Sequence, residues 1–222
     1  MDSINRAEIR SRFLKVETAN VSDVMDEMGI TDQALSTDFA PRSGHQLAGW
    51  AYTIQGTTRA GGRPTDPLKV QACSGVGPDE VTVWSGDGQG ACYLGELIAL
   101  GLQGRGCVGA LIDGGIRDIT WLAAIGFPTF STYRSPVQSI GRWQVESWGE
   151  PLRLPGATAG EVVVHPGDFI LADADGAIVV PADHVLNILQ LSEVVTRREI
   201  EIRKGLQAGM NLSEAIERFG AI

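Results

Sequence analysis

Apolar residues recur at helical spacing in two segments at the start of the chain, 4–15 (INRAEIRSRFLK) and 18–28 (TANVSDVMDEM). This pattern predicts two N-terminal helices. Near the other end, residues 183–205 form a long amphipathic segment, and NLSEAIERFG predicts a short helix capped by Asn211 or Ser213. We expect the last two segments to form a C-terminal helical arm.

The middle of the chain alternates between strand-like and helix-like stretches. Residues 47–57 (LAGWAYTIQGT) are rich in aromatic and β-branched side chains and predict a strand, whereas TTRAGGRPTDP (57–67) is composed of loop-forming residues. The pattern then predicts strand, helix, strand, helix and strand over 80–86, 91–103, 107–113, 117–125 and 128–133. This order is typical of parallel strands joined by crossover helices.

Short strand-like pieces follow, separated by turn residues such as Pro166-Gly167 and Asp175-Gly176. They are RWQVESW, EVVVH, DFILAD and AIVVP. We expect them to form an antiparallel β layer. Together the patterns predict one α/β domain over 1–222, with N-terminal helices in 1–30 and the helical arm in 183–222.

Composition narrows the class of protein. With 222 residues and 43% hydrophobic content, the chain can bury a substantial core. The net charge is -9, and the sequence contains no basic stripe. The long-range field is therefore expected to repel nucleic acid and anionic membranes. The N-terminus is charged and no apolar run approaches ~18 residues, which predicts a cytoplasmic protein. Three cysteines without CxxC spacing are expected to be reduced core thiols: Cys73, Cys92 and Cys107.

Several common catalytic patterns are absent from the sequence, including GxSxG, GxxxxGK[ST] and HExxH. The histidines are scattered beside Gly, Pro or Asp, which favours loop or surface positions for His45, His165 and His184. None of the lysines ends a predicted core strand, where desolvation would make an amine nucleophilic; they are Lys15, Lys69 and Lys204. The pattern therefore disfavours covalent imine catalysis.

The stretch 95–118, GELIALGLQGRGCVGALIDGGIRD, combines charged side chains with a buried helix and strand pattern. If 107–113 is a buried strand, Asp113, Arg117 and Asp118 fall at its carboxyl end, where open α/β sheets place ligand sites. Arg117 offers a planar fork for a carboxylate, and Asp118 offers a hard oxygen ligand for Mg²⁺ or Mn²⁺. These residues can together bind a 2-oxo acid.

Glu96 lies near the start of the preceding helix, where free backbone N–H groups favour an anion. Structural roles remain open for the same residues. Arg117 and Asp118 can form an ordinary ion pair or a helix cap, and Asp113 before Gly114-Gly115 can be a turn aspartate.

The same stretch resembles the family of 4-hydroxy-4-methyl-2-oxoglutarate aldolases and the related RraA-like proteins, the regulators of ribonuclease activity A. Those aldolases share an acidic residue, twenty intervening residues and then Arg-Asp, and Glu96, residues 97–116 and Arg117-Asp118 fit this spacing. Further similarity runs through VSDVMDEMG, FPTF, VHPGDFILADADGAIVVP and the RRE near the arm, covering roughly residues 16–205.

The resemblance implies a swivelling β/β/α-type sandwich, assembled as a homotrimer or homohexamer with sites between subunits. It assigns the substrate carboxylate to backbone groups of Gly95, Glu96, Leu97 and Ile98, and the oxo-acid end to Arg117. Asp118 would ligate a divalent cation, Mg²⁺ or Mn²⁺, directly. Glu96 and Asp113 would orient water or move protons, and Glu199 would reach a neighbouring subunit's site.

The activity implied by the resemblance is that of a metal-dependent (class II) aldolase. Such an enzyme cleaves 4-hydroxy-4-methyl-2-oxoglutarate or a related 4-hydroxy-2-oxo acid to pyruvate through a metal-stabilised enolate, and also decarboxylates oxaloacetate. The alternatives are a non-catalytic, ribonuclease-binding regulator of the same fold and a lyase acting on another acid. Asp118 favours the enzyme, since a regulator that binds no metal has no need of it. Two segments that depart from the family, TTRAGGRPTDP and GRWQVESWGEPL, can reshape the pocket mouth, although Trp143 and Trp148 can equally be core residues.

Overall fold

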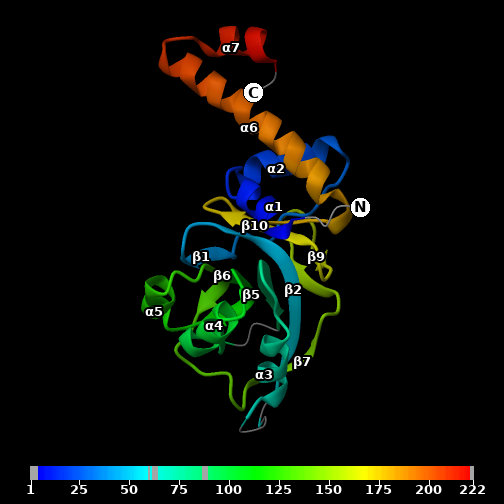
Figure 1. Ribbon diagram of the computed structural model, residues 1–222, viewed down its shortest axis with the longest axis vertical. Coiled ribbons are helices and arrows are strands. Elements are labelled where there is room, and N and C mark those ends of the chain that lie inside the picture. Colours follow the sequence, from blue (N-terminus) through cyan, green and yellow to red (C-terminus); the bar gives the residue numbers. More distant parts are fainter. Residues whose placement is uncertain (1–4, 60, 62–64, 87–89, 221–222) are drawn as a thin grey trace.

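The computed structural model describes residues 5–59, 61, 65–86 and 90–220. Arg63, in the predicted loop 57–67, lies outside these described residues. The helices predicted at the two ends of the chain form and pack together on one side of the sheet (Figure 1). They are α1 (Arg6–Phe13), α2 (Thr18–Glu27), the short 3₁₀ turn η1 (Ala182–His184), α6 (Val185–Gln207) and α7 (Leu212–Phe219).

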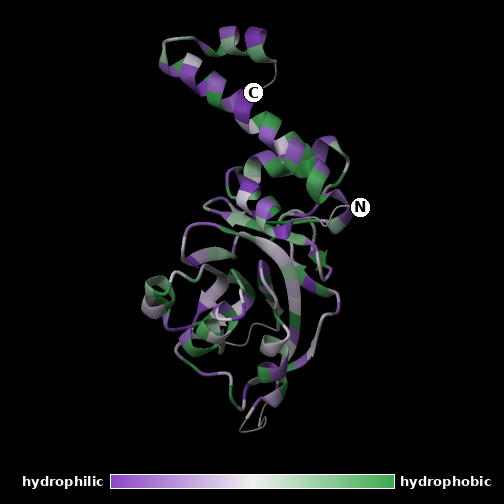
Figure 2. Cartoon of the chain, viewed as in Figure 1, coloured by the Kyte–Doolittle hydropathy of each residue, from purple (hydrophilic) through white to green (hydrophobic). Residues whose placement is uncertain are grey.

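Local contacts explain these helices. Phe13 of α1 stacks on Phe169 at a ring distance of 4.3 Å, so the helical layer is anchored to the sheet by a buried aromatic pair. The Asn211 side chain accepts a hydrogen bond from Glu214 N at 3.0 Å, and the Glu214 carboxylate accepts one from Asn211 N at 2.9 Å. Asn211 therefore caps α7, and Ser213 lies inside the helix. Figure 2 shows many hydrophilic residues on α6 and α7 where they extend away from the sheet.

Within the described residues, nine strands form one sheet in the order β1-β6-β5-β3-β2-β10-β11, with β4 paired to β5 and β7 paired to β2. The strands β3, β5 and β6 are parallel neighbours, as the alternation predicted, and β2 also pairs in parallel with β3. The bounds are β1 (Ala40–Ser43), β2 (Leu47–Thr58), β3 (Glu80–Ser85), β4 (Cys92–Leu94), β5 (Gly109–Ile116), β6 (Thr129–Arg134), β7 (Trp143–Trp148), β10 (Phe169–Asp173) and β11 (Gly176–Val180).

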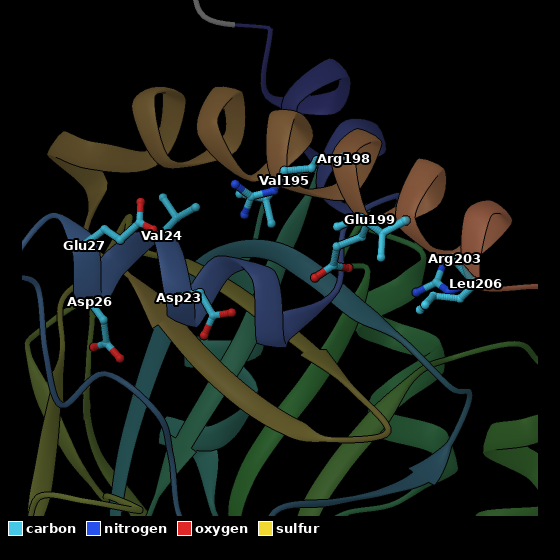
Figure 3. Close-up of a pocket in the computed structure, with 10 residues that line it drawn as sticks. Asp23, Val24, Asp26, Glu27, Val195, Arg198, Glu199, Arg203 and Leu206 are labelled. Carbon is cyan, nitrogen blue, oxygen red and sulfur yellow. The ribbon is translucent and has the colours of Figure 1, made fainter. Parts of the chain in front are cut away.

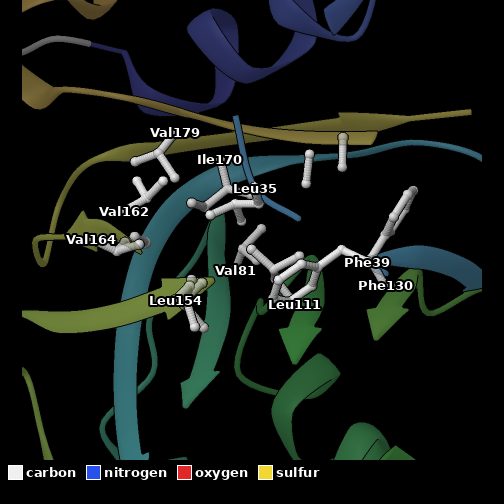
Figure 4. Packing of buried hydrophobic residues seen from close by; sticks show 14 of the residues in the cluster. Leu35, Phe39, Val81, Leu111, Phe130, Leu154, Val162, Val164, Ile170 and Val179 are labelled. Atoms are coloured by element: carbon white, nitrogen blue, oxygen red, sulfur yellow. The ribbon is translucent and has the colours of Figure 1, made fainter. Parts of the chain in front are cut away.

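Two different layers cover the parallel part of the sheet. The crossover helices α3 (Pro67–Ser74), α4 (Glu96–Gln103) and α5 (Ile119–Ala124) bury their apolar residues with Ile112 on one face. The neighbouring residue Leu111 packs on the opposite face with Leu154 and Val162 of the antiparallel hairpin β8 (Leu152–Pro155) and β9 (Glu161–Val164) (Figure 4). This arrangement of hairpin, sheet and helices confirms the predicted α/β class and its β/β/α layering.

Several predicted elements need correction. The helix expected over 91–103 begins as strand β4, which pairs with β5, and turns helical only at Glu96. The expected antiparallel layer is divided, because β10 and β11 extend the main sheet, β7 pairs with β2, and β9 pairs with β8. Helix α3 and the short strands β1 and β8 were not predicted, because each is too short to show a clear periodic pattern of apolar residues. No helix in the described ranges is both long enough and apolar enough to cross a membrane.

Candidate functional site

Strand β5 continues to Ile116, so Asp113 lies within the strand rather than after it. The register against β6 shifts between Ile112 and Gly115, which marks an irregularity around Asp113. A Cβ atom on Gly114 would overlap the ring of Tyr93. Gly114 therefore allows the Tyr93 ring to pack on the strand. Because Asp113 lies within β5, the interpretation of Asp113 as a turn aspartate is wrong.

Arg117 and Asp118 follow the carboxyl end of β5, as predicted. Asp118 adopts a left-handed backbone conformation with φ of 60°, which aspartate tolerates better than most residues. Its backbone oxygen accepts hydrogen bonds from the first turn of α5, at 2.9 Å from both Trp121 N and Leu122 N. Its side chain does not cap α5; instead Oδ2 accepts a hydrogen bond from Glu96 N at 3.1 Å. The turn thus joins two segments 22 residues apart.

The ion pair considered for Arg117 and Asp118 is present, with Nε 3.6 Å from Oδ2. Both side chains are exposed, at 42% and 39%, so the pair contributes little to stability. Within the described residues, no other ion pair engages the Arg117 guanidinium. It is therefore available for an anionic ligand.

Gly95 precedes α4 and lets Asp118 approach the helix. A Cβ atom at Gly95 would lie 2.5 Å from Asp118 Oδ2, far inside normal contact. In the part of the chain that the structure describes, the N–H groups of Leu97 and Ile98 have no hydrogen-bond partner. Free N–H groups and the helix dipole make this end of α4 suitable for a carboxylate.

A pocket of about 210 Å³ opens beside this turn. It brings together the predicted residues Gly95, Ile98 and Arg117, while Leu97 stands exposed next to it at 79%. The other lining residues are Asp66, Lys69, Cys92, Tyr93, Leu94, Gln138, Ser139 and Ile140.

Lys69 is a residue of this pocket that sequence reasoning missed. Its side chain is only 8% exposed, and Nζ donates hydrogen bonds to Tyr93 O at 2.7 Å and Ser139 Oγ at 3.0 Å. Burial lowers the pKa of the Lys69 ammonium, and the Asp66 carboxylate raises that pKa to a smaller extent. Lys69 does not end a core strand, as predicted, but the sequence pattern gave no sign that this lysine is desolvated on a helix. The sequence does contain a signal for this helix, which is the N-cap residue Asp66 followed by Pro67 at the first helical position. A helix that starts there places Lys69 and Ala72 on one buried face.

Asp113 and Glu199 lie apart from this pocket. Burial, and secondarily the charge of Asp38, raise the pKa of Asp113 from 3.8 to about 6, yet Asp113 does not line the pocket. Glu199 lies on α6, where Oε2 accepts a hydrogen bond from Asn20 Nδ2 at 3.2 Å. It borders a separate cavity of about 480 Å³ between α2 and α6 (Figure 3). A contribution of Glu199 to a neighbouring subunit's site stays a prediction.

The remaining expectations concern residues around the core. The three cysteines are free, two of them buried and Cys73 half-buried. Trp143 is a core residue, 2% exposed and stacked on Tyr93 at 4.2 Å, and Trp148 packs partly buried against the same cluster. The three histidines are exposed, as predicted. Of the loop 57–67, Asp66 reaches the pocket wall and Arg59 pairs with Glu146 at 2.8 Å.

Asp118 is the residue that the family resemblance assigns to a divalent cation. Within the described residues, no group of three or more His, Cys, Asp or Glu side chains gathers as a metal site. Mg²⁺, however, is commonly held by one or two carboxylates, several waters and the substrate. Asp118 Oδ1 accepts no hydrogen bond within the described ranges, so this carboxylate fits such a hydrated cation beside Arg117.

Comparison with known proteins decides the family. A sequence model named RraA-like, described as Aldolase/RraA, matches residues 18–179, well over half of the chain. The chain belongs to the RraA-like family. The resemblance drawn from the spacing of Glu96, Arg117 and Asp118 is thereby confirmed.

Individual RraA-like relatives are distant. Protein DlpA of Legionella pneumophila is 26% identical over 223 residues, which cover 99% of this chain and 35% of DlpA. The chain therefore spans about a third of DlpA. A protein of Halalkalibacterium halodurans, named "Putative 4-hydroxy-4-methyl-2-oxoglutarate aldolase", is 29% identical over 194 residues, or 84% of each chain.

The fold comparison agrees with the sequence comparison. The crystal structure of Streptomyces coelicolor RraAS2, described as an unusual member of the RNase ES inhibitor RraA protein family, is similar with a TM-score of 0.73. The two chains are 26% identical, and the match covers 88% of this chain and 96% of RraAS2. The RraA-like fold thus extends over most of the molecule.

Proposed function

We propose that this RraA-like protein is a divalent-metal-dependent aldolase acting on 4-hydroxy-4-methyl-2-oxoglutarate or a related 4-hydroxy-2-oxo acid, with oxaloacetate decarboxylase activity. The observation that carries the proposal is the hydrogen bond from Glu96 N to Asp118 Oδ2, which brings the two ends of the acid-X20-Arg-Asp pattern together beside the pocket that Arg117 lines. A regulator acting through its surface has no use for this arrangement. The aldolase name of the Halalkalibacterium halodurans relative supports the same chemistry.

The proposal assigns the first binding step to the backbone and Arg117. The N–H groups of Leu97 and Ile98 receive the C1 carboxylate of the substrate, and the Arg117 guanidinium faces its 2-oxo end. Asp118 holds Mg²⁺ or Mn²⁺, which supplies Lewis acidity to the 2-oxo group when bound. These interactions would hold the 2-oxo acid end of the substrate.

Cleavage then requires a proton acceptor and a proton donor. Glu96, through a water molecule, accepts the proton of the C4 hydroxyl as the C3–C4 bond breaks and C4 becomes a ketone. The electron pair of that bond moves to the 2-oxo group, and protonation at C3 completes the first pyruvate. From 4-hydroxy-4-methyl-2-oxoglutarate the other fragment is also pyruvate. Loss of CO₂ from oxaloacetate leaves the same three-carbon fragment, so one site can serve both reactions.

The test is pyruvate release from 4-hydroxy-4-methyl-2-oxoglutarate and from oxaloacetate, each with Mg²⁺ and with EDTA. We expect turnover that EDTA abolishes and that Arg117→Ala reduces about a hundredfold or more. The matched control is Arg153→Ala, since Arg153 is also exposed and pairs with Glu161 on the remote hairpin. Absence of turnover with both acids in the folded protein would overturn the aldolase assignment.

The similarity to RraAS2 makes a ribonuclease-binding regulator the second candidate. The two candidates differ in their dependence on Asp118, because only the aldolase needs a carboxylate that holds a divalent cation. Inhibition of a ribonuclease that Asp118→Asn leaves unchanged, without turnover of either acid, would favour the regulator.

A further inference from the structure

The Lys69 ammonium has an unusual environment for a charged group. Nζ donates to Tyr93 O and Ser139 Oγ, and it lies 5.0 Å from the ring centroid of Trp143 and 5.9 Å from that of Trp84. An ammonium carries three donors, and the described residues supply acceptors for two of them. One N–H is therefore left for another acceptor.

The described residues provide no direct counter-ion for this buried cation. Among residues 5–59, 61, 65–86 and 90–220, no ion pair within 4.0 Å includes Lys69. The nearby carboxylate of Asp66 is already engaged, with Oδ1 accepting from Lys69 N at 3.1 Å and Oδ2 from Val145 N at 3.0 Å. A buried charge without a close partner is costly, and an anion bound beside it would remove much of that cost.

The pocket that Lys69 lines also contains Arg117, and its other charged lining residue is Asp66. Two cations therefore face one cavity of about 210 Å³ whose single carboxylate is occupied by backbone N–H groups. A substrate with one carboxylate can satisfy Arg117 and the end of α4. A substrate with two acidic groups can satisfy Lys69 as well.

We propose that the Lys69 ammonium binds the second acidic group of a dianionic 2-oxo acid in the pocket that it shares with Arg117. The assignment rests on the proposed function, because it takes the 2-oxo end of the ligand to lie at Arg117. Lys69 then determines specificity: it selects dicarboxylic over monocarboxylic oxo acids through a direct charge-assisted hydrogen bond.

Binding of two unreactive probes tests this role. The probes are 2-oxoglutarate and 2-oxopentanoate, which share a carbon skeleton and differ only in whether the far end is a carboxylate or a methyl group. Neither carries a 4-hydroxyl group, so calorimetry with Mg²⁺ measures affinity without turnover. We expect the unmodified protein to bind 2-oxoglutarate about tenfold or more tightly than 2-oxopentanoate.

The variant is Lys69→Met, which keeps the length of the side chain and removes its charge. Replacing a buried charge by an apolar group of similar volume is often neutral or stabilising, so we expect the variant to fold. Lys204→Met is the matched control, because Lys204 is 66% exposed on α6 and forms a surface ion pair with Glu201. If thermal denaturation shows that Lys69→Met is unfolded, Lys69→Gln takes its place, since Gln keeps a donor for Tyr93 O.

The expected result is that Lys69→Met loses the preference for 2-oxoglutarate and keeps its affinity for 2-oxopentanoate within about twofold, while Lys204→Met changes neither. Equal weakening of both probes, an unchanged preference, or no binding of either probe would overturn the Lys69 assignment. So would borohydride trapping of pyruvate on Lys69, which would make this amine a nucleophile. If the preference depends on Lys69 but neither aldol nor oxaloacetate is turned over, the aldolase proposal fails and the binding role stands.

Discussion

The backbone and the carboxylate of Asp118 make separate contributions to the site. Its φ of 60° positions the start of α5, and its carboxylate bonds to Glu96 N across the site. A strained backbone conformation at such a place is commonly retained for function. Asparagine tolerates the same conformation and keeps a side-chain acceptor, but it lacks the charge that a divalent cation requires.

We therefore expect Asp118→Asn to lower turnover about a hundredfold or more while its melting temperature stays close to that of the unmodified protein. Steady-state kinetics and thermal denaturation measure the two effects. Asp32→Asn is the control, because Asp32 has a similar φ of 62° but bonds to Thr158. Full activity of Asp118→Asn with Mg²⁺ would remove this residue from the proposed metal site.

The raised pKa of Asp113 makes the stability of the folded protein depend on pH. Burial raises its pKa from 3.8 to about 6, so between about pH 4 and pH 6 the folded protein holds a proton that the unfolded chain has released. For a carboxyl group shifted in this direction, the cost to stability is absent below about pH 4, grows between pH 4 and 6, and is complete above pH 6.

Asp113→Asn removes the buried charge and is expected to raise the free energy of unfolding at pH 7. The increase is on the order of 1 kcal/mol, because solvent reaches the half-buried group and screens its charge. At pH 4 the difference should nearly vanish. Urea denaturation at both pH values measures it, with Asp175→Asn as an exposed control. Equal effects at pH 4 and pH 7 would show that Asp113 acts through packing rather than charge.

At the scale of elements, the site is a junction between the end of β5 and the start of α4. The sequence predicted that a strand and a helix meet near Glu96 and Arg117, because their apolar periodicity is strong. It did not predict β4, whose three residues form a strand only by pairing with β5. It also missed α3, a helix of eight residues with a weak apolar face, and with it the buried position of Lys69.

The contact between α4 and Asp118 depends on Gly95. We expect Gly95→Ala to push Asp118 away and lower turnover about tenfold or more, because its Cβ would lie 2.5 Å from Oδ2. Gly101→Ala is the control in the same helix, since nothing lies within 4 Å of its Cβ, and it should stabilise the protein by up to about 1 kcal/mol. Kinetics and urea denaturation of both variants distinguish a local effect on the site from a general effect on α4.

At the scale of the whole molecule, two helices near the site, α4 and α5, expose large apolar side chains. Leu97 on α4 is 79% exposed and Trp121 on α5 is 64% exposed, and these two helices are neighbours. Large exposed apolar side chains that gather in one place commonly mark an interface. The homotrimer or homohexamer implied by the family resemblance would cover this surface and enclose the pocket.

Trp121→Glu is expected to reduce the mass of the assembly, because a carboxylate would be buried in the interface. Light scattering after size-exclusion chromatography measures that mass. Val163→Glu is the control, an exposed apolar residue on the hairpin β8–β9. An assembly whose mass Trp121→Glu leaves unchanged would place the interface elsewhere.

The amino-acid pattern was sufficient for the α/β class, the parallel strands and both helical ends, because each depends on periodicity within one segment. The acid-X20-Arg-Asp spacing was likewise sufficient for the family. Spacing could not distinguish a carboxylate in the turn after β5 from one within the strand, so Asp113 was grouped with Asp118 although it is Asp118 that bonds to the start of α4. The spacing also could not show that Lys69 lines the same pocket as Arg117. Lys69 lies on α3 and Arg117 follows β5, and these two segments meet only in the folded protein. The burial of Asp113 and Lys69, and the position of Lys69 near Arg117, depend on contacts between segments that are distant in the sequence. These contacts form only when the helices pack on the sheet, so the tertiary structure determines them.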